Sequence, residues 1–155
     1  MKAFSFSLQK LLDVKEALER AAEARLADCM RKWEAAKAKL KELAARCQQE
    51  VSQIEALGGS TTHRHKLSAH MRYLERIQAK VHLQLQAVVE HELAVEQARQ
   101  ELCEYVRERK SLEKLKENEK RQWLAELKRR EQKETDEFAV SGFIRQQDVE
   151  LVVEG

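Results

Sequence analysis

The chain has 155 residues and a mass of 18.1 kDa, enough for one ordinary domain or one long rod but not for two globular units. Charged residues make up 36% of it and aromatic residues 5%, while proline is absent and glycine occurs four times. Collagen-like, disulfide-rich, turn-rich β and doubly wound α/β chains need more Gly, Pro or Cys than this. The composition is typical of long helices and coiled coils.

The formal net charge of +2 gives the molecule no strong attraction to nucleic acid or to an anionic membrane. The N-terminus lacks the apolar run of a signal peptide, and no stretch approaches the roughly 18 apolar residues of a membrane span. Three cysteines, without a Cys-x-x-Cys pair, are typical of a reducing compartment. We therefore expect a soluble cytoplasmic protein with no membrane-inserted segment.

One strong helix-breaking segment occurs in the first 140 residues, the sequence Gly-Gly-Ser-Thr-Thr at residues 58–62. Gly58 is placed to adopt the left-handed conformation that ends many helices. The side-chain oxygen of Ser60 or Thr61 can then accept hydrogen bonds from the first N–H groups of a second helix. The segment therefore predicts a turn between two helices.

The predicted helices span about 8–57 and about 62–140, with the turn at 58–61. A short loop between two long helices makes an antiparallel hairpin the simplest fold. We expect residues 1–142 to form this single all-α coiled-coil hairpin, in which the longer second helix overhangs the first. Residues 143–155, which follow the third glycine, are expected to be a flexible C-terminal tail.

The first helix carries an apolar repeat at steps of three and four residues, the pattern of a coiled-coil seam. Two consecutive steps of four at Leu18, Ala22 and Leu26 are expected to unwind the supercoil locally. Thirteen of the fifteen seam positions are apolar, and the full set is Leu8, Leu11, Lys15, Leu18, Ala22, Leu26, Cys29, Trp33, Ala36, Leu40, Leu43, Cys47, Glu50, Ile54 and Leu57.

The second helix fits the same template less closely. Folding about residue 60 places residue x near residue 120 minus x, so that Trp33 faces the region of Ala87. The first helix then runs out opposite about residue 112, and the rest of the second helix has nothing from its own chain beside it. Nine of its twelve predicted seam positions are apolar: Leu67, Met71, Leu74, Gln78, Val81, Leu85, Val88, Glu92, Val95, Arg99, Leu102 and Val106.

The predicted overhang has a distinct charge pattern. Residues 107–134 contain eleven Lys or Arg and seven Asp or Glu, a net of +4. Residues 135–155 contain five acids and one arginine, a net of −4. Trp123, Leu124 and Leu127 form an apolar island within the basic part. Because an isolated helix is marginal in water, we expect this segment to be frayed or held by a partner.

No motif supports catalysis, a metal or a cofactor. The lone Gly-Gly lacks the residues of a phosphate-binding loop. His63 and His65 lie near the turn with His70, but no third or fourth ligand is evident and neighbouring basic residues oppose a cation, so a solvated turn is favoured. Cys29 and Cys47 fall on the seam, where we expect small apolar fillers.

Two surface features remain. The run Lys128-Arg129-Arg130 is flanked by glutamates, which favours a solvated helix face over a nucleic-acid contact. A second feature is a stripe at helical spacing beside the second seam, which is either a binding surface or simply the shoulder of the coiled-coil contact. The stripe consists of Tyr73, Ile77, Lys80 and Gln84.

Three segments carry a recognisable pattern. Residues 4–12, Phe-Ser-Phe-Ser-Leu-Gln-Lys-Leu-Leu, have an aromatic-x-aromatic, Leu-x-x-Leu-Leu opening, and residues 73–77, Tyr-Leu-Glu-Arg-Ile, follow the turn. The most specific part joins the Lys-x-Leu-Glu-Lys-Leu run within 107–117 to the Glu-Gln-Lys-x-x-Asp-Glu run within 131–139. In these segments the chain resembles the flagellar FliJ proteins, small coiled-coil components of the flagellar type III export apparatus.

The resemblance implies a two-helix antiparallel coiled coil similar to the rotor stalk of rotary ATPases. Members of that family sit in the central opening of the hexameric flagellar export ATPase, contact the export-gate membrane protein and help to cycle substrate-specific export chaperones. It further implies a non-enzymatic protein needed for motility. Such a protein would be cytoplasmic and peripherally associated with the inner membrane at the flagellar base.

The resemblance also suggests contact residues. The export gate would contact the stripe of Tyr73, Ile77, Lys80 and Gln84. The ATPase would contact residues at the other end of the hairpin, namely Phe4, Phe6, Leu8, Leu11, Leu12, Arg109, Lys110, Leu112, Leu115, Gln132, Lys133, Asp136, Glu137 and Phe138.

Three alternatives stay open at the level of sequence. The chain could be the equivalent stalk of a virulence-type secretion system, which gene context alone would distinguish. It could be a generic structural coiled coil that homodimerises or scaffolds other proteins. Binding of nucleic acid through residues 107–134 is the third alternative, and it predicts a steep dependence of affinity on salt.

Overall fold

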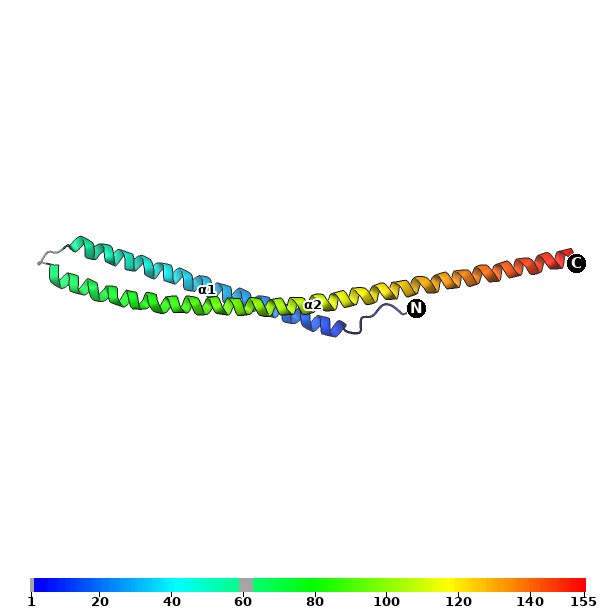
Figure 1. Cartoon of the computed structure of the whole chain (residues 1–155), viewed down its shortest axis with the longest axis horizontal. Coiled ribbons are helices and arrows are strands. Elements are labelled where there is room, and N and C mark those ends of the chain that lie inside the picture. The colour runs from blue at the N-terminus through cyan, green and yellow to red at the C-terminus, as the bar shows by residue number, and fades with distance from the viewer. Residues whose placement is uncertain (1, 59–62) are drawn as a thin grey trace. The chain divides into compact units, whose positions relative to one another are not determined.

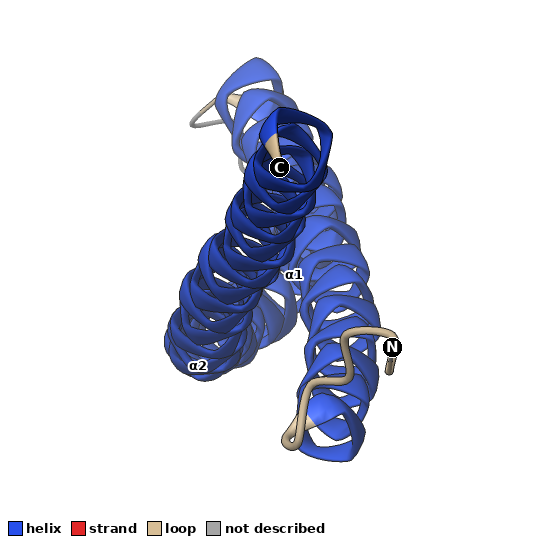
Figure 2. Cartoon of the chain, turned by 90° about the vertical axis from the view of Figure 1, so that its right-hand side faces the viewer, coloured by secondary structure: helices blue, strands red, loops and turns tan. Residues whose placement is uncertain are grey.

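The structure is a computed structural model that describes residues 2–58 and 63–155. Two helices contain nearly all of these residues, α1 (Gln9–Leu57) with 49 residues and α2 (Arg64–Glu154) with 91. The helices run antiparallel (Figure 1), and the described part of the chain contains no strand (Figure 2). The predicted fold class, an all-α antiparallel coiled-coil hairpin with a longer second helix, is confirmed.

Helix α1 ends where the sequence predicts, because Gly58 adopts a left-handed backbone with a φ of 57°. Its N–H donates a hydrogen bond to the carbonyl of Glu55 at 3.3 Å, which closes the last turn. A side chain is strained at this φ, so glycine suits the position. The predicted caps Ser60 and Thr61 lie outside the described residues.

Helix α2 ends later than the sequence predicts. The helix was expected to stop near residue 140, but it continues to Glu154. The chain has no proline, and the isolated Gly142 costs only about 1 kcal/mol relative to alanine, which does not by itself end a helix. The flexibility expected of residues 143–155 stays a prediction.

Intramolecular contacts divide the chain into two compact units, each with part of α1 and part of α2. The hairpin unit comprises Glu16–Arg107, and the terminal unit comprises Met1–Lys15 together with Glu108–Gly155. In the hairpin unit the two helices meet along a single seam. The seam buries small and branched side chains that are between 1% and 8% exposed: Ala22, Ala36, Leu43, Ile77, Val95 and Ala98.

Along α1 the predicted seam is confirmed from Lys15 to Leu57, since all thirteen predicted positions in that range are buried or half-buried. The prediction is wrong at the beginning of the helix. Leu8 and Leu11 are 37% and 42% exposed, whereas Leu12 is 3% exposed. Because α1 begins only at Gln9, the helical period cannot be extended back through Leu8.

Along α2 the predicted seam is half right. Leu67, Leu74, the predicted positions at each further seventh residue and the last position, Val106, are covered, but the other predicted positions, such as Met71 and Leu85, are exposed. Starting from Leu67, the covered positions are separated alternately by three and four residues, whereas the predicted positions were separated alternately by four and three. The intervening seam residues are therefore His70, Ile77, Gln84, His91, Ala98 and Tyr105.

The corrected seam contains polar side chains, and two of them, Gln84 and His70, have hydrogen-bond partners on α1. The Gln84 side-chain amide donates to the carbonyl of Ala36 at 3.0 Å, an approach that the small alanine side chain leaves open. Nδ1 of His70 lies 2.5 Å from Oε1 of Glu50. Glu50 is 5% exposed and is the buried charged residue among those described, so this hydrogen bond satisfies a carboxylate removed from water.

The substitution His70→Leu is expected to lower the free energy of unfolding by about 1–3 kcal/mol, because it leaves the Glu50 carboxylate buried without its partner. Adding Glu50→Leu should recover most of that loss, since the buried pair is then replaced by two apolar side chains. Urea unfolding followed by circular dichroism measures both effects.

A matched control is Arg121→Ala, which removes an ion pair with Glu117 whose side chains are 73% and 70% exposed. That loss should stay below about 0.5 kcal/mol, as for other solvated pairs. If the double variant of the seam were as unstable as His70→Leu alone, the Glu50–His70 contact would not explain the contribution of His70.

Candidate partner-binding surface of the terminal unit

The terminal unit contains a short N-terminal segment, the first turns of α1 and the part of α2 from Glu108 onward. Residues 2–8, called the strap below, precede α1 and are not helical. The strap lies beside α2 (Figure 1) and contacts it beyond Lys116, the residue that faces the start of α1. It therefore covers a stretch of α2 that α1 does not reach.

Two aromatic side chains of the strap are covered, and one of them contacts α2 directly. Phe6 is 8% exposed, and its burial contributes about 2–3 kcal/mol. The rings of Phe4 and Trp123 lie with their centroids 5.9 Å apart at an interplanar angle of 52°. This tilted arrangement is favoured for aromatic pairs and adds about 0.5–1.5 kcal/mol.

The start of α1 is fixed by polar contacts at the same place. The N–H of Gln9 donates to the carbonyl of Phe6 at 3.2 Å, which joins the strap to the helix. Nζ of Lys116 donates to the Gln9 side-chain oxygen at 2.7 Å, and Lys15 forms an ion pair with Glu108 at 2.5 Å. These bonds tie the first turns of α1 to α2 on either side of the buried Leu12.

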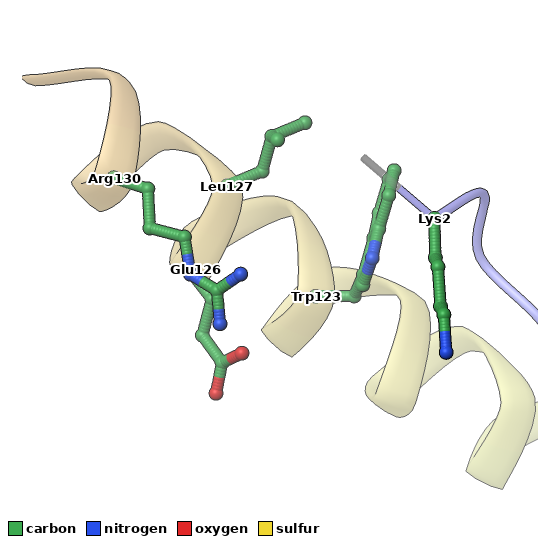
Figure 3. A pocket seen from close by; sticks show the side chains of 5 residues that line it. All are labelled: Lys2, Trp123, Glu126, Leu127 and Arg130. Atoms are coloured by element: carbon green, nitrogen blue, oxygen red, sulfur yellow. The ribbon is translucent and has the colours of Figure 1, made fainter. Parts of the chain in front are cut away.

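A hollow of about 300 Å³ lies next to the strap. In Figure 3 the Trp123 ring stands between the side chains of Lys2 and Leu127, and Glu126 and Arg130 complete the lining. An aromatic face and a leucine bordered by both signs of charge suit an apolar side chain of a partner protein with polar neighbours.

The strap corrects one prediction about the overhang. The sequence predicts that α2 has nothing from its own chain beside it after about residue 112, but Trp123 and Leu127 are half-buried in the strap region. From residue 128 to Glu154, in contrast, every residue of α2 is exposed. This bare stretch carries eight large apolar side chains that are 53–83% exposed: Phe138, Val140, Phe143, Ile144, Val149, Leu151, Val152 and Val153.

All fourteen residues predicted to contact an ATPase fall in the terminal unit, so the structure brings them into one compact part of the chain. They differ in accessibility. Phe6 and Leu12 are buried within the protein itself, and Phe4, Arg109 and Leu112 are half-buried. The exposed members are Leu8, Leu11, Lys110, Leu115, Gln132, Lys133, Asp136, Glu137 and Phe138. Their contact with an ATPase stays a prediction.

The four residues predicted to contact an export gate lie in the hairpin unit, where they do not form one exposed stripe. Ile77 is 3% exposed, and Gln84 is part-buried with its amide bound to α1. Tyr73 is 47% exposed and Lys80 is also exposed. Only these two are accessible to a partner, and their contact with a gate stays a prediction.

The sequence does not predict the contact between Phe4 and Trp123. A signal is nevertheless present, because aromatic residues make up only 5% of the chain and an antiparallel hairpin brings these two segments to the same end. The helical period could not place the strap, since a non-helical segment carries no such period.

The histidines, cysteines and helices were also considered as sites of other chemistry. Within residues 2–58 and 63–155, no group of three or more His, Cys, Asp or Glu side chains is arranged to hold a metal ion. The cysteines are free thiols, with Cys29 and Cys47 half-buried and Cys103 exposed. The helices described here also lack any stretch of sufficient length and apolar character to cross a bilayer.

The substitution Phe6→Ala is expected to speed amide hydrogen exchange at residues 119–127 of α2 by about tenfold or more, because a loss of 1.4 kcal/mol changes an opening equilibrium tenfold. Residues 67–95 should keep their wild-type rates. Leu83→Ala is the matched control, since Leu83 is 65% exposed and its truncation removes little contact. Unchanged exchange at 119–127 in Phe6→Ala would show that the strap does not stabilise α2.

Comparisons with known proteins agree with this architecture. The family described as "Flagellar FliJ protein" matches residues 4–148. A solved structure described as "Structure of a putative YscO homolog CT670 from Chlamydia trachomatis" has a TM-score of 0.67 at 22% identity, and the match covers 88% of this chain and 93% of that one. This likeness supports the fold. No curated protein sequence matches the chain. The family match spans nearly all of both units, and the chain therefore belongs to the flagellar FliJ family as a coiled-coil protein associated with type III export.

Proposed function

We propose that this protein is a non-enzymatic stalk of the flagellar export apparatus, which binds the hexameric export ATPase through its terminal unit. One observation carries the proposal. Residues 128–154 of α2 are exposed throughout and yet carry eight large apolar side chains. A single solvated helix is marginal in water, and a large exposed apolar area is typical of a protein interface. A partner that covers this part of α2 would stabilise it.

The charge distribution supports a partner that recognises the helix in one orientation. Residues 107–134 carry a net charge of +4 and residues 135–155 a net charge of −4. A binding site with the opposite order of charges would attract the helix in one direction and repel it in the other. A central opening in a ring-shaped ATPase is a site in which such orientation matters.

The contact with the export gate is assigned more narrowly than the sequence suggests. Tyr73 and Lys80 are the accessible residues of the predicted set, whereas Ile77 and Gln84 hold α2 against α1. Handling of substrate-specific export chaperones, and a peripheral position at the inner membrane near the flagellar base, complete the proposal. Family membership supports both of these parts of the proposal.

The protein is expected to raise the turnover rate of its cognate hexameric export ATPase, measured as phosphate release. Truncation after Lys110 should abolish the stimulation, because it removes the part of α2 that the strap covers and the exposed apolar part beyond it. Full stimulation by the truncated protein would contradict the proposal.

Point substitutions separate contact from folding. Phe138→Ala should raise the concentration for half-maximal stimulation by about tenfold, the usual effect of truncating an aromatic residue at the centre of an interface. Phe138 is 83% exposed in the free protein, so stability should not change. Leu83→Ala, at an exposed position of the hairpin unit, is the control and should stimulate like the wild type. Equal effects of the two variants would argue against an ATPase contact at Phe138.

For the export gate, Tyr73→Ala is expected to weaken binding of the soluble gate domain while leaving the unfolding free energy within about 0.5 kcal/mol of wild type. Ile77→Ala should instead lower the unfolding free energy by about 2–4 kcal/mol, because Ile77 is 3% exposed in the seam. Isothermal titration calorimetry and urea unfolding distinguish the two effects. Wild-type gate binding by Tyr73→Ala would remove this residue from the assignment.

A further inference from the structure

The strap and the α2 face that it covers belong to the same proposed binding surface. Phe4 and Phe6 are among the residues expected to contact the ATPase, but in this structure Phe4 packs on Trp123 of the protein's own α2 and Phe6 is buried within the protein. Trp123, the largest apolar side chain in that part of α2, is half-buried and contacts the Phe4 ring. In the free protein, therefore, the strap covers the Trp123 face of α2, and both belong to the proposed ATPase-binding surface.

The strap is held weakly for its length. Of its residues, Phe6 alone is buried and Phe4 is half-buried, while residues 2, 3, 5, 7 and 8 are exposed. Among the described residues, no backbone hydrogen bond joins the strap to α2; those that involve it run to Gln9 and Leu12, at the start of α1. The conformational entropy lost on fixing a non-helical segment opposes the burial of the two rings. A segment held by two side chains at such a cost can be displaced.

The hollow beside Trp123 provides a site at which a partner could make its first contact before it displaces the strap. The hollow of about 300 Å³ beside Trp123 is lined by Lys2 at the beginning of the strap and by Leu127 and Arg130 on α2. A partner side chain that enters this hollow would touch the Trp123 ring and would compete with Lys2 and Phe4 for it. Displacement could then proceed along the strap toward Phe6.

We propose that residues 2–8 are a displaceable strap, which covers the Trp123 face of α2 in the free protein and is released when the export ATPase binds that face. The identity of this partner rests on the proposed function. Release uncovers Trp123 on α2 and frees Phe4 and Phe6 at the same time, so one event exposes both apolar parts of the surface. The strap thus lowers the apparent affinity in proportion to the fraction of molecules in which it is closed.

The first experiment tests the closed strap in the free protein, without the ATPase. In a Trp33→Phe background, Trp123 is the remaining tryptophan and reports on the strap. Phenylalanine at position 33 loses no hydrogen bond, because the Trp33 Nε1 is buried without a partner. Deletion of residues 2–7 should increase iodide quenching of the Trp123 fluorescence at least about twofold, as expected when a half-buried ring becomes exposed. Equal quenching with and without the strap would overturn the inference.

The second experiment locks the strap. Ser5→Cys and Gln122→Cys place thiols on two exposed positions, one on the strap and one on α2, that both line a second hollow between these segments. The variant is made in a background in which the native cysteines are replaced (Cys29→Ala, Cys47→Ala, Cys103→Ser). A short thiosulfonate cross-linker then closes the strap reversibly, and dithiothreitol reopens it.

Cross-linking is expected to weaken binding to the ATPase by at least about tenfold, because it removes the open fraction, and dithiothreitol should restore the affinity. The matched control is Arg25→Cys with Glu101→Cys, which joins α1 to α2 in the hairpin unit at an exposed ion pair of 2.9 Å. The control should bind equally well before and after reduction. Equal binding by the locked and the reduced strap variants would show that release is not required.

The two experiments keep the inference separate from the proposed function. If the wild type does not bind the ATPase while Trp123 is protected by the strap, the proposed function fails and the closed strap stands. If the wild type binds and the locked variant binds equally well, the proposed function stands and displacement is wrong.

Discussion

A hairpin of two helices has no third element to cover its apolar residues, so a single seam between α1 and α2 must hold the fold. The seam therefore uses side chains that fit a narrow interface, and Ala22, Ala36 and Ala98 are among those most deeply buried. Small side chains allow the two backbones to approach closely, and the amide of Gln84 reaches the carbonyl of Ala36 for that reason. In the described part of the hairpin unit, large apolar side chains outside the seam, such as Leu83 and Leu93, are left exposed.

Polar residues in such a seam select one alignment of the helices over others. A slip of α2 along α1 would separate His70 from Glu50 and would leave a carboxylate buried without a hydrogen bond. The apolar seam residues repeat along both helices and distinguish alternative alignments less well. The polar contacts thus set which residues of the hairpin unit are accessible, and they explain why Tyr73 is exposed while Ile77 is buried.

The terminal unit shows the same constraint at the point where α1 begins. Once α1 has begun at Gln9, only the strap remains to cover α2, and it extends cover as far as the region of Trp123 and Leu127. Beyond this, α2 is exposed and carries eight large apolar side chains among its charged residues. A chain that is held by one seam, and that presents both a bare stretch of helix and a weakly covered one, has two surfaces that a partner could cover. The exposed surface is where a partner supplies the contacts that a single chain lacks.

Local chemistry in the sequence determined the two helices, the left-handed Gly58 and the seam of α1 from Lys15 onward, because each depends on the helical period or on one residue's backbone freedom. Only the tertiary structure decided which face of α2 meets α1. Two templates there were about equally apolar, and the pairing of His70 and Gln84 with α1 selects between them. The position of the strap could likewise not be predicted from sequence periodicity, since residues 2–8 are not helical. Phe4 contacts Trp123 only after the chain has folded back on itself.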